Sequence, residues 1–160
     1  MRASARIPFF AGAPVELRGD RFLDASIYES IPYRTAMNNN DITDIVVLLT
    51  RPEGNSRSEP GWVDRYIVAP YLAKFDPELK VHHLERAAQY RQELEAIFSH
   101  ASLGSHPRML PIQIPKSAHK IGSLETSRAK LVNGAIDGFQ ATYSALGLAV
   151  PSLVELLTPV

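Results

Sequence analysis

Residues 38–52, NNNDITDIVVLLTRP, contain the segment that decides the fold. A polar turn cluster leads into the continuous apolar run Ile45 to Leu49, which Thr50-Arg51-Pro52 closes. A run that is apolar on both faces and bounded by turn residues is typical of a buried strand in an α/β sheet. The sequence therefore predicts a central strand whose two faces are both covered.

Upstream of this strand the sequence predicts two short elements. The apolar residues that flank RGDR (18–21) indicate two short strands joined by a Gly-Asp turn, a hairpin. They are Val15, Leu17, Phe22 and Leu23. Pro32 suits the first turn of a helix, so residues 32–38 are expected to form a brief one.

Directly downstream, a loop and short helices are expected. Residues 53–61, EGNSRSEPG, predict a polar loop of the kind that borders a site. Residues 62–75, WVDRYIVAPYLAKF, predict one or two short helices with their aromatic side chains in the core. Those side chains are Trp62, Tyr66, Tyr71 and Phe75.

The C-terminal half predicts two long helices around a short strand. Apolar residues at helical spacing predict an amphipathic helix over 83–102 and a last helix from Ser123 to Leu146. In the last helix, Gly134 and Gly138 lower the helix propensity, which predicts that another element packs closely against the helix at these positions. MLPIQIP (109–115) predicts a strand at a sheet edge, because proline lacks the ladder donor. Strand, helix, strand and helix in this order predict a layered α/β fold.

Composition limits the classes of function. A chain of 160 residues that is 45% hydrophobic can bury one core, so a single domain over 1–160 is expected. Lys plus Arg and Asp plus Glu both total 17, which leaves no basic field for nucleic acid. The absence of cysteine excludes disulfides and thiolate metal sites and fits a cytoplasmic protein.

Hydropathy argues against a membrane span and a secretory signal. No window approaches the roughly 18 continuous apolar residues of a membrane span. The start, MRASARIPFFAGAPV, imitates a signal peptide, but Pro8, Gly12 and Pro14 interrupt its apolar stretch.

RGDRFLDASIYESIPYRTA (18–36) places Asp24 at the exit of the predicted hairpin. A carboxylate at the end of a strand can act as general base to a serine that arrives from elsewhere in the fold, or orient a histidine. It can equally cap a turn by accepting local backbone N–H groups. Spacing alone leaves both interpretations open.

The order of several short motifs resembles the patatin-like phospholipase family. Members show A-S-x-x-x-P, then Pro-Val, then G-x-x-[YF]-x-D-G-[GA] ending in the catalytic aspartate, then an Ile-Pro turn and a strand ending in TRP. The matching positions here are Ala3-Ser4, Pro8, Pro14-Val15, Gly19, Phe22, Asp24, Ile31-Pro32, Ala36 and Thr50-Arg51-Pro52. Arg86 to Tyr90 and the final helix with Gly134 also look like the C-terminal region of bacterial members.

This resemblance implies the C-terminal half of a layered α/β/α acyl hydrolase that uses a serine-aspartate dyad and no cofactor or metal. Asp24 would be the general base. The nucleophile is missing, because Gly134 and Gly138 are the only glycines four apart and they enclose Ile136, not a serine. No two glycines adjoin, so the family's oxyanion loop is absent too. Ala25 stands where the family has glycine.

Other candidate residues have simpler explanations. Ser4 would be structural in the family's turn, and Ser105 beside His106 reads as a helix-ending loop. The five histidines form no H-x-x-x-H pair, so a catalytic metal is not expected. They are His82, His83, His100, His106 and His119. PKSAHK, with Lys116, His119 and Lys120, could meet a lipid phosphate or be a solvated basic loop.

Two functions therefore remain open. The chain could represent a lipid acyl hydrolase, a hydrolase of lipid degradation that acts on phospholipid esters and is inactive without an upstream half. It could instead be a truncated, non-catalytic family member that acts as a binding or interaction module. The expected partners are a lipid ester, the missing half or a second copy, in the cytoplasm or peripherally at a membrane.

Overall fold

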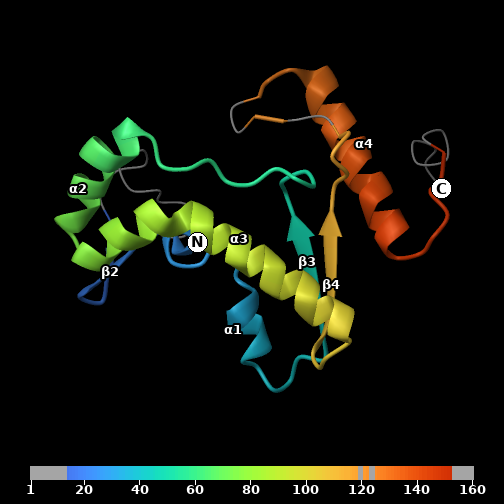
Figure 1. The fold of residues 1–160 in the computed structure, drawn as a ribbon, viewed down its shortest axis with the longest axis horizontal. Helices are drawn as coiled ribbons and strands as arrows, with labels where there is room; N and C mark the ends of the chain where they lie inside the picture. Colours follow the sequence, from blue (N-terminus) through green and yellow to red (C-terminus); the bar gives the residue numbers. More distant parts are fainter. Residues whose placement is uncertain (1–13, 119–120, 123–124, 153–160) are drawn as a thin grey trace. The chain divides into compact units, whose positions relative to one another are not determined.

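A computed structural model describes residues 14–118, 121–122 and 125–152 (Figure 1). Its contacts divide the chain into two compact units. Unit 1 comprises Met1–Asn38 and Ser56–Ala96, and unit 2 comprises Asn39–Asn55 and Ile97–Val160. The architecture is mixed α/β, with a small antiparallel sheet in unit 1, a small parallel sheet in unit 2, and long helices. The single domain expected over 1–160 stays a prediction.

Unit 1 begins with the predicted hairpin. Strands β1 (Val15–Leu17) and β2 (Asp20–Phe22) pair antiparallel, with Leu17 opposite Asp20. The turn is Arg18-Gly19, not the predicted Gly-Asp pair. Both residues have positive φ, 55° and 88° respectively, as the favoured two-residue hairpin turn requires. Glycine is needed at only one of the two turn positions, and here it is the second.

Short helices follow the hairpin and build the core of unit 1. They are η2 (Ala25–Ile27), α1 (Tyr33–Met37), η3 (Asp64–Val68) and α2 (Ala69–Ala73), so the brief helix predicted over 32–38 is confirmed. The core contains Ile27, Val68, Leu72 and Leu79, against which Leu23, Tyr71 and Phe75 pack. The prediction that the aromatic side chains of 62–75 lie in the core is wrong for two of them, because Trp62 is 69% exposed and Tyr66 is 77% exposed.

Helix α3 (Pro77–Leu103) is the longest element and passes from one unit into the other. It begins six residues before the predicted start at 83. The Asp76 carboxylate accepts the N–H of Glu78 at 2.8 Å, and Pro77 has the fixed φ that suits a first helical turn. The Asp-Pro-Glu sequence therefore explains the earlier start.

Unit 2 contains the strand predicted from the apolar run. Strand β3 (Asp44–Leu49) pairs parallel with β4 (Arg108–Gln113), and Val47 lies opposite Pro111. Val47 and Leu49 are buried, but Val46 is 57% exposed and Leu48 is 69% exposed. The prediction of two covered faces is wrong for the part of the chain that the structure describes, because no described element packs over these two side chains.

Within the described ranges, the second strand, β4, lies at an edge, as its proline predicts. The N–H of Arg108 donates to the carbonyl of Thr43, on the side of β3. Alternate residues of a strand direct their backbone groups to opposite sides, so the backbone of Pro111 faces away from β3. The missing N–H of Pro111 thus falls on the outer edge, where it costs no ladder hydrogen bond.

Helix α4 (Arg128–Ala145) packs against β4. It begins after Ser127, and the start predicted at Ser123 lies outside the described residues. A Cβ at Gly134 would lie 2.7 Å from Cγ1 of Ile121, so the predicted close packing is confirmed there. A Cβ at Gly138 would meet nothing within 4 Å, so the same prediction is wrong at that position. Among the described helices, none has the length and apolarity needed to cross a membrane.

Candidate functional site

Asp24 caps the short helix that follows the hairpin. Its Oδ1 accepts the backbone N–H of Ser26 at 2.8 Å, and its extended backbone (φ −62°, ψ 124°) is typical of a residue preceding a helix. The side chain is half-buried. Within the described residues, Oδ2 has no hydrogen bond. The capping interpretation is therefore confirmed, and the general-base role stays a prediction that the second oxygen leaves open.

A polar cavity of about 430 Å³ lies in unit 1, close in sequence to Asp24. Its lining residues are Tyr28, Glu29, Arg34, His82, Gln89, Gln92 and Glu93. The Tyr28 and His82 rings meet edge to face at 5.0 Å, and Gln89 lies 3.1 Å from Nδ1 of His82. Asp24 does not line this cavity. The cavity could hold a small polar molecule, but the predicted base is not part of it.

Glu93 is the most buried group in this cavity, only 4% exposed. Burial raises the pKa of its carboxyl group, although the N–H groups of Ile31 and Ser30 oppose that shift. A buried carboxyl group with a raised pKa keeps its proton to a higher pH than an ordinary glutamate does, and such residues are a common feature of functional sites. No pattern in the sequence identified Glu93, since it lies among other polar residues of α3.

A second titratable cluster in unit 1 joins Asp64, His83 and Arg86. Oδ1 of Asp64 lies 2.9 Å from Nε2 of His83 and 2.9 Å from Nη2 of Arg86, and Oδ2 accepts the N–H of Gly61 at 3.0 Å. Burial raises the pKa of Asp64, but the Gly61 N–H, His83 and Arg86 together hold it below its ordinary value. Burial, and then the charge of Arg86, lower the pKa of His83.

The contact with Asp64 favours one tautomer of His83. The Asp64 carboxylate can only accept, so Nε2 of His83 carries the proton. Nη1 of Arg86 lies 3.2 Å from both Nδ1 and Nε2 of the same ring. The cluster therefore holds η3 against α3, with the imidazole between a carboxylate and a guanidinium group. The sequence did not reveal it, because Asp64 and His83 lie 19 positions apart without a motif.

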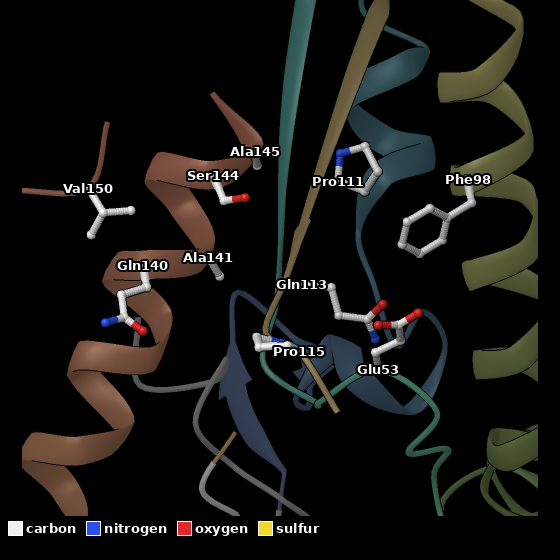
Figure 2. Close-up of a pocket in the computed structure, with 10 residues that line it drawn as sticks. All are labelled: Glu53, Phe98, Pro111, Gln113, Pro115, Gln140, Ala141, Ser144, Ala145 and Val150. Atoms are coloured by element: carbon white, nitrogen blue, oxygen red, sulfur yellow. The ribbon is translucent and has the colours of Figure 1, made fainter. Parts of the chain in front are cut away.

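Unit 2 contains a larger groove, of about 600 Å³, beside β4 (Figure 2). It is lined by Glu53, Phe98, Pro111, Gln113, Pro115, Gln140, Ala141, Ser144, Ala145 and Val150. Figure 2 shows Phe98 on one side of β4 and the α4 residues on the other. Nε2 of Gln113 donates to the carbonyl of Arg51 at 3.1 Å. Apolar side chains dominate the lining, so the groove suits a ligand with an apolar body.

The other candidate residues are not brought into these sites. Ser105 follows α3 in a loop, next to the exposed His106, and the imidazole of His100 contacts the carbonyl of Pro107 at 2.8 Å. Lys116 is exposed. Ser4, His119 and Lys120 lie outside the described residues. Across the described ranges, no group of three or more His, Asp or Glu side chains could hold a metal ion.

No family model matches the chain, and neither the curated proteins nor the solved structures include a match.

Proposed function

We propose that the chain is the C-terminal half of a patatin-like phospholipase, a lipid acyl hydrolase of layered α/β/α fold, and that it supplies Asp24 as general base. A serine outside these 160 residues would attack the ester carbonyl while Asp24 takes the hydroxyl proton. Asp24 returns this proton to the oxygen of the leaving lipid alcohol. Water then attacks the acyl-serine while Asp24 takes a proton from it and gives it back to the serine oxygen, which releases the fatty acid. The chain alone is inactive, because the parts of such a site act as a unit.

One observation carries this proposal. The backbone N–H of Ser26 holds Oδ1 of Asp24 at 2.8 Å, and Oδ2 has no partner within the described residues. A carboxylate held by one oxygen has a fixed orientation and can still accept a proton on the other.

An esterase assay tests the proposal. The purified chain is assayed on p-nitrophenyl butyrate alone and together with the segment encoded upstream of Met1, which is first inspected for an in-frame G-x-S-x-G. We expect no turnover from the chain alone and turnover from the combination. Asp24→Asn should lower that turnover by about 10³-fold or more, because asparagine preserves the cap but cannot take the proton.

Asp20→Asn is the matched control, since Asp20 is an exposed aspartate of the hairpin that precedes Asp24. It should leave turnover unchanged. Esterase activity from the chain alone that Asp24→Asn abolishes would show that a nucleophile is present after all. Equal activity of wild type and Asp24→Asn in the combination would remove Asp24 from the mechanism.

A non-catalytic interaction module is the second candidate. The exposed apolar side chains of β3, Val46 and Leu48, favour it, because side chains of this type are normally covered in a parallel sheet. Absence of an in-frame G-x-S-x-G upstream, together with absence of turnover under every condition, would support this function.

A further inference from the structure

One edge of strand β3 in unit 2 has no hydrogen-bonding partner strand among the described residues. Among the described residues, β3 pairs with β4 alone. Because Thr43 receives its hydrogen bond from β4, the alternation along the strand turns the backbone groups of Val46 and Leu48 toward the other edge. The side chains of these same two residues are 57% and 69% exposed. An added strand would satisfy both the backbone groups and the side chains.

The two edges of this sheet differ in their ability to accept a strand. The β4 edge has Pro111, whose missing N–H interrupts any new ladder there. The β3 edge, Asp44–Leu49, has no proline and no lysine. Its one charged residue, Asp44, is already paired with Arg108 at 2.7 Å. The sheet can therefore be extended at β3 and is protected at β4.

We propose that β3 pairs antiparallel with β3 of a second copy of this chain, around a two-fold axis beside Val47. The result is a four-stranded sheet in the order β4-β3-β3-β4. Two copies of one strand are self-complementary under a two-fold axis, since each contact occurs twice. This association describes the chain by itself, without the upstream half that the proposed acyl hydrolase requires.

Side-chain chemistry selects the alignment of the two strands. With Val47 opposite Val47 of the second copy, Val46 lies opposite the second copy's Leu48, and Asp44 lies opposite Thr50. Each exposed apolar side chain then meets another, and the carboxylate meets a hydroxyl. A shift by two positions would set Asp44 opposite Leu48 in one direction and Val46 opposite Thr50 in the other. The favoured alignment also pairs the backbone groups of Val46 and Leu48, which are the ones turned toward this edge.

Disulfide trapping tests the alignment directly, because the chain contains no cysteine. Val46→Cys and Leu48→Cys are purified separately, mixed, oxidised and compared with each variant alone. Directly opposite positions lie within the range of a disulfide. We expect the mixture to form a disulfide-linked dimer several times faster than either variant alone. Equal rates would overturn the alignment. Mixing Val46→Cys with Leu103→Cys is the control, since Leu103 is also exposed in unit 2.

Analytical ultracentrifugation tests the association itself. We expect wild type to show a concentration-dependent monomer–dimer equilibrium, and Val46→Lys/Leu48→Lys to weaken it at least about tenfold by placing like charges opposite each other. Leu103→Lys should leave the equilibrium unchanged. Circular dichroism checks that the variants remain folded, which their exposed positions favour. A wild type that remains monomeric at all concentrations, or a dimer insensitive to the double substitution, would overturn the proposal.

Discussion

The carboxylate of Glu93 accepts the backbone N–H of Ile31, 62 positions earlier in the chain, at 3.1 Å. Glu93 is 4% exposed and Ile31 is 8% exposed, so both groups of this hydrogen bond are removed from water. One side chain of α3 thereby fixes the turn that precedes α1. The loop between η2 and α1 depends on this contact, because a buried N–H without an acceptor is costly.

Substitutions at Glu93 should separate the hydrogen bond from the charge. Glu93→Ala removes the acceptor and should lower the free energy of unfolding of the chain by about 1–3 kcal/mol. Glu93→Gln keeps an acceptor oxygen and should cost much less. Urea denaturation measures both. Glu95→Ala, at an exposed position of the same helix, should change stability by less than about 0.5 kcal/mol. An equal loss there would mean that the effect of Glu93→Ala does not come from the hydrogen bond to Ile31.

Acid should destabilise the chain through His83. Burial lowers the pKa of His83 below its ordinary 6.5, so the unfolded chain binds this proton more tightly than the folded chain. This contribution to stability is present above pH 6.5 and is lost as the pH falls through the lowered value. In His83→Gln the amide can still donate to Asp64 and accept from Arg86 but does not titrate. We therefore expect a weaker acid dependence in urea denaturation between pH 6.5 and 4.5; an unchanged slope would contradict it.

Glu93 should have the opposite effect on the pH dependence of stability between pH 6.5 and 4.5. Its pKa is raised above 4.5, so its contribution to stability is present below pH 4.5 and is lost as the pH rises through the raised value. In wild type this opposes the effect of His83. Glu93→Gln removes the offset, so its free energy of unfolding should fall more steeply with acid than that of wild type. A shallower dependence would show that Glu93 is not protonated more readily in the folded chain.

The two glycines of α4 should respond differently to alanine. Gly138→Ala meets nothing within 4 Å and should raise stability by about 0.5–1 kcal/mol through helix propensity. Gly134→Ala places a Cβ 2.7 Å from Cγ1 of Ile121, so it should give none of this gain or be destabilising. Thermal denaturation compares them. Adding Ile121→Ala should make Gly134→Ala less costly than it is in wild type, and no such coupling would mean that the two residues are not in contact.

The cap at Asp24 should contribute to stability regardless of any chemistry. Asp24→Ala loses the acceptor of the Ser26 N–H and should cost about 0.5–2 kcal/mol, whereas Asp24→Asn should cost little. Chemical denaturation of the chain alone gives both values. Asp20→Ala serves as the control at an exposed position. If Asp24→Ala proves as stable as wild type, the cap is not formed in solution.

Local signals in the sequence predicted most of the elements but few of the contacts between them. The apolar run at 45–49, the proline in β4 and the hairpin were identified because turn residues and strand periodicity act over a few positions. The exposed face of β3 was not predicted. A pattern of apolar residues shows which side chains favour burial, but it does not show which element covers them. Glu93 with Ile31, and Asp64 with His83, join positions 62 and 19 apart, and nothing local marks such pairs.

Pro111 restricts the addition of a further strand to one edge of this small sheet, the edge formed by β3. If two copies join through β3, both outer edges of the new sheet are β4, and each carries a proline where a third copy would need a donor. The pairing thus uses up the one edge that can be extended, and the assembly ends at two copies. Because Pro111 lacks an N–H, the dimer does not add further copies through its outer strands, as sheets that form fibrils do.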